Sequence, residues 1–254
     1  MIDLRDISGL PIFLDEKKMD LEFRGDFPFI KKSERSLEEL RPYLKNPEAA
    51  GGPDPVYRVW RHACLKQDEE KVKAANLRYD LTLIPPGRID GEFAKTAGHY
   101  HKSYPEVYEV LHGRAYFLIQ KPGKDFKNIE SAILVEAGPG EKFLIPPAYG
   151  HNTINVFDEP LIMANWLSNS ADPYDYEPYK ILNGASYRLI AEGDLVDIVK
   201  NPAYESAPDI RKIRPKEMPQ FGLIKKQPLY SLVGNLEKLR ILNRPEEFSS
   251  AFKL

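Results

Sequence analysis

A series of short, strand-like segments separated by turn residues limits most strongly how this chain can fold. Alternating or continuous apolar runs recur at intervals of roughly 8–12 residues, and proline or glycine stands between most of them. This spacing is typical of an all-β sandwich or barrel, because long helices do not fit between such breaks. We expect core strands over residues 56–61, 77–84, 106–111, 115–120, 129–135, 142–145, 152–156 and 161–167.

The composition favours a soluble globular protein and excludes several classes of partner. The 254 residues are 42% hydrophobic and 29% charged, and a net charge of −2 leaves no broad basic surface for nucleic acid or a membrane. No apolar run approaches the roughly 18 residues of a membrane helix, and no secretory signal is visible at the N-terminus. The single cysteine, Cys64, is expected to be a structural thiol beside Trp60 and Leu65 rather than a reactive one, and a cytoplasmic location is predicted.

The region before the strand series has a different pattern. Residues 1–32 are irregular, with mixed apolar and charged positions. Ser36 and Glu39 then form a capping box, which predicts a short helix that Pro42 would weaken. We assign residues 1–53 to an N-terminal extension that packs on a barrel.

The barrel is assigned to residues 54–204, and its last part should be a hairpin over 187–190 and 195–199. The remaining residues, 205–254, form a C-terminal extension. Leucines at helix-compatible spacing predict that this extension is helical over residues 229–242.

Three of the five histidines fall in two motif-like stretches. His99 and His101 are two positions apart in an extended segment, so their side chains project to the same side. A turn at Pro105 would return Glu106 to that side, and His151 would add a fourth ligand from a separate strand. Three ring nitrogens and one carboxylate suit Fe(II), Mn(II), Ni(II) or Zn(II), and they leave coordination positions open for water or substrate.

The other two histidines and the flanking lysines have simpler interpretations. We interpret His112, which precedes the turn at Gly113, as a packing or surface residue. For His62 we favour the same interpretation over the alternative of a metal pair with Cys64. Lys95 and Lys102 alternate away from Thr96 and His101, so we expect both lysines on a solvated face.

The two stretches are similar to the two signatures of the cupin superfamily. There is one departure from the first signature. The position six residues before the first histidine, where a glycine is usual, is occupied by Phe93 here, and the nearest glycine is Gly91, two positions earlier. The motifs read His99-x-His101-x4-Glu106-x6-Gly113 and Pro146-Pro147-x-x-Gly150-His151-x3-Asn155.

Within that superfamily the chain resembles the cupin-type phosphoglucose isomerases, known mainly from archaea, over residues 54–202. The elements Thr-x-Gly-His-x-His over 96–101 and Glu-Val-Tyr over 106–108 are more specific than the general cupin pattern. The resemblance implies a jelly-roll-like barrel, a homodimer, and interconversion of glucose 6-phosphate and fructose 6-phosphate in glycolysis and gluconeogenesis.

The same resemblance implies a role for each candidate residue. One divalent metal per subunit, Fe(II) before Mn(II), Ni(II) or Zn(II), would be bound by His99, His101, Glu106 and His151. The phosphate group would be held by Tyr57, Thr82, Thr96 and Gly98, and Tyr108 would line the sugar site.

Glu106 and Tyr108 are the catalytic candidates. Glu106 is the candidate base by position, but a carboxylate bound tightly to metal is a poor base. It would have to leave the metal when substrate arrives, or hydrogen would move by a direct hydride shift. Some relatives place a histidine after the last core strand, whereas residues 168–176 contain none here, so Tyr174 or Tyr176 is the candidate replacement.

Two other functions use the same motifs. A cupin Fe(II) dioxygenase has these four ligands and open positions for oxygen and a chelating substrate. A non-catalytic sugar-binding cupin would bind ligand without turnover. The Thr-x-Gly before the metal pair, which resembles a phosphate site, argues against the dioxygenase. The complete set of metal ligands argues against the non-catalytic sugar-binding cupin.

Overall fold

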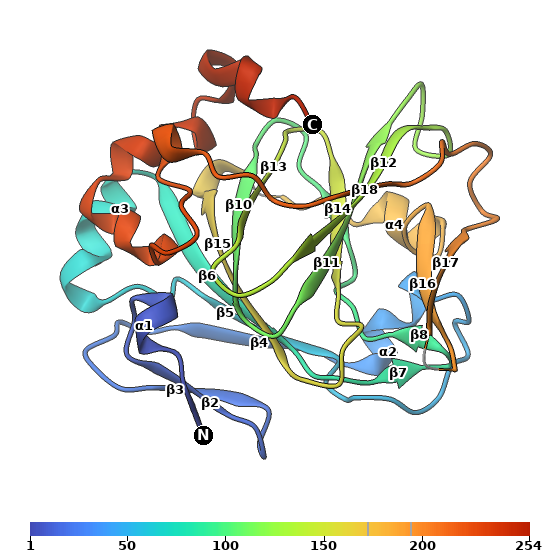
Figure 1. The fold of residues 1–254 in the computed structure, drawn as a ribbon, viewed down its shortest axis with the longest axis horizontal. Helices are drawn as coiled ribbons and strands as arrows, with labels where there is room; N and C mark the ends of the chain where they lie inside the picture. Colours follow the sequence, from blue (N-terminus) through green and yellow to red (C-terminus); the bar gives the residue numbers. More distant parts are fainter. Residues whose placement is uncertain (172, 194) are drawn as a thin grey trace.

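Two β-sheets with a hydrophobic core between them form the main body of the computed structural model (Figure 1), which describes residues 1–171, 173–193 and 195–254. The strands of the larger sheet are, in order, β13 (Lys142–Ile145), β10 (Glu106–His112), β15 (Leu161–Ser168), β6 (Leu77–Ile84), β5 (Tyr57–Arg61) and β4 (Lys31–Arg35). Those of the second are β18 (Arg211–Ile213), β12 (Ile129–Ala137), β11 (Ala115–Pro122), β14 (Gly150–Ile154) and β9 (His99–Tyr100). Neighbouring strands are antiparallel, except for the parallel pair β12 and β18.

Smaller elements flank these sheets. One small sheet contains β1 (Ile2–Asp3), β2 (Ile12–Asp15) and β3 (Asp20–Phe23), and the other contains β17 (Leu195–Lys200), β16 (Tyr187–Glu192), β8 (Glu92–Phe93) and β7 (Arg88–Ile89). The α-helices are α1 (Arg5–Ser8), α2 (Leu37–Leu40), α3 (Glu69–Ala74) and α4 (Glu177–Ile181). The 3₁₀ helices are η1 (Arg41–Tyr43), η2 (Lys66–Asp68), η3 (Asn169–Ala171), η4 (Pro219–Phe221), η5 (Leu229–Gly234), η6 (Leu236–Leu242) and η7 (Pro245–Phe252).

Strand β6 separates an apolar layer from a polar pocket. All of its residues are buried, and successive side chains point to opposite faces of the sheet. Tyr79 and Leu81 belong to the hydrophobic cluster that includes the C-terminal segment, whereas Asp80 and Thr82 line a pocket on the other face. The larger sheet is therefore covered by the C-terminal segment on one side and forms the pocket floor on the other.

The predicted all-β, jelly-roll-like fold is confirmed. Each expected core strand is present, with small differences at the ends; β14, for example, begins at Gly150 and so includes His151. The hairpin of β16 and β17 is also present. Among the described residues the strand pairs do not join the two large sheets into one closed barrel.

The capping box at the start of α2 is confirmed. The Ser36 hydroxyl accepts a hydrogen bond from the Glu39 N–H, and the Glu39 carboxylate accepts one from the Ser36 N–H. The helix ends after one turn and continues as the 3₁₀ helix η1, which contains Pro42, because proline cannot donate the next helical hydrogen bond.

The sequence prediction for residues 1–32 was wrong in part. They contain β1 to β3 and the start of β4, which pairs with β5 at the edge of the larger sheet. The strand Lys31–Arg35 has the sequence Lys-Lys-Ser-Glu-Arg, which lacks apolar alternation and has low strand propensity. Its place in the sheet comes from tertiary pairing, so the large sheet begins well before residue 54.

The predicted helix over residues 229–242 is replaced by η5 and η6. Gly234 and Asn235 separate them, and the backbone of Asn235 leaves the helical region, with φ −152° and ψ 74°. Glycine and asparagine are weak helix formers. Leu232, Leu239 and Leu242 are nevertheless buried, as the leucine spacing predicts.

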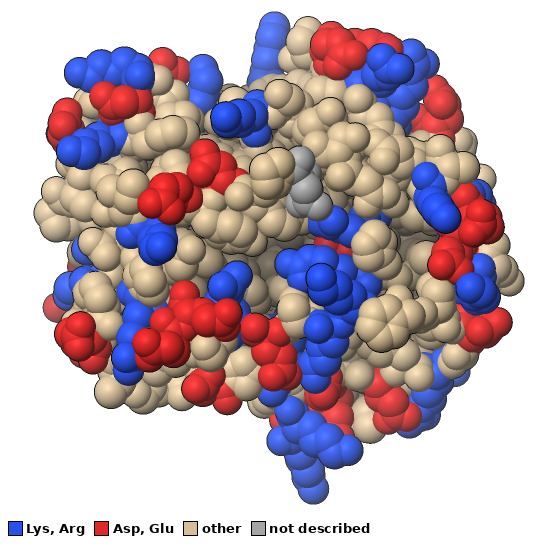
Figure 2. All heavy atoms as spheres, turned by 180° about the vertical axis from the view of Figure 1, so that it is seen from behind, with Lys and Arg blue, Asp and Glu red and all other residues tan. Residues whose placement is uncertain are grey.

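In residues 1–171, 173–193 and 195–254 we find no helix long and apolar enough to cross a membrane. On the face seen in Figure 2, Lys and Arg side chains are interspersed with Asp and Glu, and a group of Lys and Arg lies near the centre.

Candidate functional site

A polar pocket of about 350 Å³ lies against the inner face of the larger sheet. It contains three of the four candidate metal ligands, His99, Glu106 and His151, and every other candidate site residue. Those other residues are Tyr57, Thr82, Thr96, Gly98 and Tyr108. The structure therefore brings together residues that lie far apart in the sequence.

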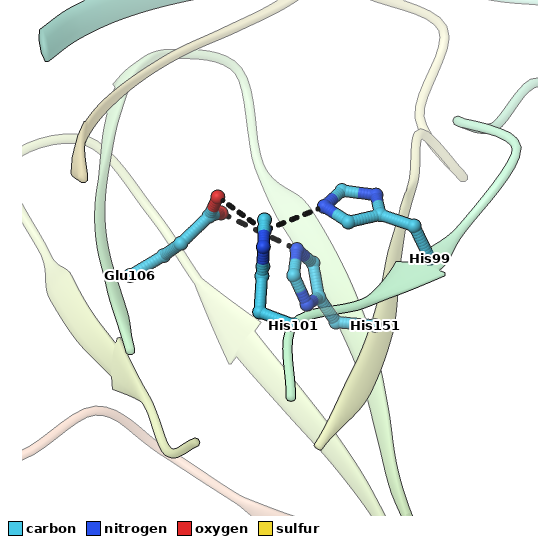
Figure 3. A group of neighbouring side chains, drawn as sticks. All are labelled: His99, His101, Glu106 and His151. Atoms are coloured by element: carbon cyan, nitrogen blue, oxygen red, sulfur yellow. Dashed lines mark hydrogen bonds and ion pairs between the residues drawn. The ribbon is translucent and has the colours of Figure 1, made fainter. Parts of the chain in front are cut away.

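The four candidate metal ligands point toward one another (Figure 3), and three of them line this pocket. His99 lies on β9 and pairs in register with His151 on β14, while Glu106 begins β10 in the opposite sheet. His101 follows β9, and its Nε2 lies 3.0 Å from His99 Nε2 and 2.8 Å from Glu106 Oε1. His151 Nε2 lies 3.3 Å from Glu106 Oε2. One ligand atom from each residue lies within 4.8 Å of all the others.

These separations fit a single metal ion. Ligand atoms bound about 2.1 Å from an ion and at right angles lie about 3 Å apart. The spacings of 3.0 Å and 2.8 Å around His101 are close to that value. The four residues therefore form a cluster that could hold one divalent ion.

The hydrogen bonding of His101 supports the same conclusion. Its Nδ1 lies 2.9 Å from the Ala171 carbonyl oxygen, and because a carbonyl only accepts, Nδ1 must donate. In a neutral ring the Nε2 lone pair then faces the Glu106 carboxylate at 2.8 Å. Two acceptors at that distance need a cation or a proton between them.

The burial of the cluster determines its charge state. Burial raises the pKa of Glu106, but the charges and hydrogen bonds of His101 and His151 outweigh it, so its pKa lies well below the usual range. Burial, together with the neighbouring histidines, holds the pKa of His99 well below its usual value. An ionised carboxylate at Glu106 and a neutral imidazole at His99 are the protonation states that metal binding requires.

Two glycines let the histidine-bearing strands approach their neighbours. A Cβ atom at Gly98 would overlap the ring of Tyr179, and Gly98 has φ +81°. A Cβ atom at Gly150 would overlap the ring of Tyr100 on β9. Glycine at these two positions therefore allows the close packing that places His99 and His151 side by side.

Tyr108, on β10, lines the pocket beside the cluster. Its side chain is buried, and its hydroxyl is 3.4 Å from His151 Nε2. Burial, followed by the charge of Glu106, raises the pKa of Tyr108 well above its usual value. Tyr108 is therefore a neutral hydroxyl beside the candidate metal ligands.

The candidate phosphate residues lie on neighbouring strands and loops around the same pocket. Thr82 on β6 is paired in register with Val59 on β5. Thr96 is held against β14, because its hydroxyl accepts a hydrogen bond from the Thr153 N–H at 2.9 Å. Tyr57 begins β5, and its hydroxyl oxygen accepts a hydrogen bond from Arg35 at 3.3 Å.

The two tyrosines considered as replacements for the absent histidine both line the pocket. The ring centre of Tyr174 lies 4.5 Å from that of His99, and the ring centre of Tyr176 lies 5.4 Å from it. The Tyr174 hydroxyl also accepts a hydrogen bond from Arg78. Asp172, in the same segment, lies outside the described residues.

Several pocket residues were missed by the sequence analysis. Arg61, Asp80 and Asn165 lie on correctly predicted strands, at positions that alternation places on the same face as Thr82 and Tyr108. Strand periodicity could have identified them. Arg35 lies on the unpredicted strand β4, so the sequence contained no comparable signal for it.

The prediction for Lys95 was wrong. It does alternate away from Thr96, but it is buried and forms an ion pair with Glu92. The face opposite Thr96 is interior, because buried Glu92 on β8 lies against Lys95 there. His62 is exposed and His112 is partly buried, in line with their interpretation as packing or surface residues. Cys64 is buried, in line with a structural thiol.

The two-sheet fold and the motif spacing define a cupin-type protein with a candidate mononuclear metal centre. The family model for glucose-6-phosphate isomerase (GPI) matches residues 34–205. The chain therefore belongs to the glucose-6-phosphate isomerase family.

Curated relatives agree with this assignment. A glucose-6-phosphate isomerase of Thermococcus onnurineus is 33% identical over 194 residues, which cover 74% of this chain and 95% of that protein. One from Thermococcus kodakarensis is 32% identical over 200 residues, covering 77% and 97%. A solved oxalate oxidase structure is similar over 50% of this chain and 58% of that one, with a TM-score of 0.38 and 16% identity.

Proposed function

We propose that this protein is a metal-dependent aldose–ketose isomerase that interconverts glucose 6-phosphate and fructose 6-phosphate. The observation that carries the proposal is the position of the His/Glu cluster, which opens onto the same pocket as Tyr57, Thr82, Thr96 and Gly98. Membership of the glucose-6-phosphate isomerase family supports this reading.

The metal ligands are proposed to be His99, His101, Glu106 and His151, with one ion per subunit. Fe(II) is the first candidate, and Mn(II), Ni(II) and Zn(II) are the alternatives. When bound, such an ion supplies a positive charge that orients the two substrate oxygens and stabilises the negative charge that develops on them.

Two side chains are proposed to act on the reacting atoms. Glu106 is the candidate base for the proton on the substrate carbon, although its low pKa makes it a weak one. Tyr108 is a neutral hydroxyl beside His151, so it can donate a hydrogen bond to a substrate oxygen. If hydrogen moves as a hydride, Glu106 is only a ligand and Tyr108 keeps its orienting role.

The phosphate group is proposed to lie near the hydroxyls of Tyr57, Thr82 and Thr96 and the backbone N–H of Gly98. Hydroxyl and amide donors satisfy phosphate oxygens without a P-loop. Tyr174 or Tyr176 is the proposed replacement for the sugar contact that a histidine makes in some relatives.

The test is an isomerase assay on protein treated with a chelator and then resupplied with each metal. We expect interconversion of the two hexose phosphates to disappear on chelation and to return with Fe(II) or Mn(II). Full activity in the metal-free protein would refute metal dependence, and no turnover with any metal would refute the proposed activity.

The same assay separates the alternative functions. A dioxygenase would consume oxygen and would be inactive without it, whereas the isomerase should work equally well under anaerobic conditions. A sugar-binding cupin would bind the hexose phosphates without converting them. Either result would replace the isomerase proposal.

The chain is also proposed to form a homodimer in the cytoplasm and to act in glycolysis and gluconeogenesis. Light scattering coupled to size-exclusion chromatography would test the dimer, since the monomer has a mass of 29.1 kDa. The division into residues 1–53, 54–204 and 205–254 stays a proposal as well.

A further inference from the structure

The N-terminal strand β4 forms one wall of the candidate active-site pocket. It pairs with β5 in antiparallel register, so that Arg35 lies opposite Tyr57 and Lys31 lies opposite Arg61. On β5 the alternate residues Tyr57, Val59 and Arg61 face the pocket, and every residue of β4 except Lys32 lines it. The pocket-facing residues from this part of the chain are Lys31, Ser33, Glu34, Arg35, Glu39, Tyr57, Val59 and Arg61.

Arg35 presents its charge beside the proposed phosphate site. Its Nε donates to the Tyr57 hydroxyl at 3.3 Å, and its guanidinium lies 5.9 Å from the centre of the Tyr176 ring. Its nearest carboxylate is that of Glu39 at 3.6 Å, and the Glu39 side chain is 52% exposed and is also engaged in the α2 capping box. This contact neutralises the Arg35 charge only weakly, because water screens it.

Arg61 lies two positions after Val59, on the same face of β5 as Tyr57. One of its terminal nitrogens donates to the Ser33 hydroxyl on β4 at 2.6 Å. Across the part of the chain that the structure describes, no carboxylate forms an ion pair with Arg61. A partly buried guanidinium with spare donors is suited to an anionic ligand.

The carboxylates of Asp80 and Glu34, which also line the pocket near these arginines, already have cationic partners. Asp80 forms an ion pair with Arg78 at 2.9 Å, with both side chains buried. Glu34 is paired with Arg58 at 2.9 Å and with Lys32 at 3.2 Å. The carboxylates therefore do not cancel the positive charge of Arg35 and Arg61.

We propose that Arg35 and Arg61 form a cationic wall that receives the phosphate group of the substrate. The proposal rests on the proposed hexose-phosphate isomerase function and deepens it. The hydroxyls of Tyr57, Thr82 and Thr96 give direction but no charge, whereas a phosphate at neutral pH carries close to two negative charges. Planar guanidinium groups match phosphate oxygens in geometry and charge.

The consequence is a specificity role for the N-terminal segment. Arg35 and Arg61 select phosphorylated over unphosphorylated sugars, and they act on binding rather than on the reacting carbons. Substituting either arginine should raise KM and change kcat little, because the phosphate group is bound equally in the ground state and the transition state.

The test compares Arg35→Met and Arg61→Met in the full-length, metal-loaded protein. Inorganic phosphate is the probe, used as a competitive inhibitor and in a calorimetric binding titration. Loss of a charge-assisted hydrogen bond should weaken phosphate binding and raise KM by roughly 10- to 100-fold, with kcat changed by less than about threefold. Arg24→Met is the matched control, because Arg24 lies outside the pocket and forms its ion pair with Glu22.

Two lysine variants provide a second measurement in case the methionine variants do not fold. Arg35→Lys and Arg61→Lys keep the charge but lose the planar fork, so we expect intermediate binding. If the methionine variants fail to fold, as judged by circular dichroism and thermal melting, these lysine variants still report the effect. Unchanged phosphate binding and KM in folded variants would overturn the proposal.

The binding titration separates this proposal from the proposed function. A protein without isomerase activity that binds phosphate through Arg35 and Arg61 would refute the function and keep the cationic wall. An active isomerase whose variants bind phosphate as tightly as the wild type would keep the function and refute the wall.

Discussion

Glu106 is the residue on which most of the site's chemistry converges. Its two oxygens face His101 and His151, and it begins the strand that also carries Tyr108. The same carboxylate is proposed both to hold the metal and to move a proton. These two roles make different demands on its basicity, and a single substitution separates them.

The substitution Glu106→Gln keeps the size and removes the charge. If Glu106 is both ligand and base, kcat should fall by roughly 10²- to 10⁴-fold, even at saturating metal. Metal content after dialysis should fall too. The measurement is kcat across a metal titration; near wild-type activity at saturating metal would remove Glu106 from the proton transfer.

Gly150 tests how closely β9 and β14 must approach. In Gly150→Ala the new methyl group would overlap the Tyr100 ring, so the strands must separate. We expect a loss of about 1–3 kcal/mol in the free energy of unfolding, as for other overpacked sites, and weaker metal retention. Gly234→Ala is the control, since nothing lies within 4 Å of a Cβ there. Equal stability of both variants would contradict this account.

At the scale of elements, a buried ion pair fixes the C-terminal segment to the outer face of the larger sheet. The Glu109 carboxylate on β10 lies 2.6 Å from Lys142 Nζ on β13 and accepts a hydrogen bond from the Leu229 N–H at 2.7 Å. Trp166 Nε1 on β15 also donates to the Leu229 carbonyl at 3.0 Å. The start of η5 is therefore held by two strands, β10 and β15, and Lys142 on β13 pairs with the Glu109 carboxylate that makes one of these contacts.

This arrangement predicts a pH dependence. Burial raises the pKa of Glu109 to about 7, although Lys142 and the Leu229 N–H act in the opposite direction. An acid whose pKa is higher in the folded state than in the unfolded state favours folding at low pH, and its contribution declines as pH rises from about 4.5 to about 7. Above that window the contribution is constant.

The measurement is denaturant unfolding of the wild type and Glu109→Gln from pH 4.5 to 8. Glutamine does not titrate, so the stability of the wild type relative to the variant should fall as pH rises through this range. Lys142 keeps the Gly140 carbonyl as a partner in the variant. A constant difference between the two proteins would show that Glu109 does not titrate there.

The elements also show what the sequence could predict. The core strands, the capping box of α2 and the convergence of the His/Glu cluster followed from alternation, spacing and motif. Strand β4 did not, because its polar sequence becomes a strand only by pairing with β5. The interior position of Lys95 also depends on tertiary contact with Glu92 on β8, which the alternation pattern did not reveal.

At the scale of the whole molecule, the candidate metal ligands come from both large sheets. Glu106 is on the larger sheet, and His99 and His151 are on the second one. A bound ion would therefore link the two sheets across the core. An ion that binds the folded but not the unfolded state stabilises the protein by mass action.

Metal loading should accordingly raise the melting temperature. At a free ion concentration of about 100 times Kd the gain is about 2.7 kcal/mol, which corresponds to roughly 5–10 °C for a chain of this size. The measurement is thermal melting with chelator and with added Mn(II). The variant His151→Ala should lose most of the shift, and an equal shift in that variant would place the stabilising ion elsewhere.

Because the ligands are divided between two sheets, the spacing of the ligand atoms depends on the distance between those sheets. Tyr108 and Phe117 pack between the sheets with ring centres 5.3 Å apart, and side chains of this kind set how far Glu106 lies from His99 and His151. A substitution in this layer that thins or thickens the core would change the ligand spacing without touching a ligand. Evolution could thus tune which ion the centre prefers through hydrophobic residues alone.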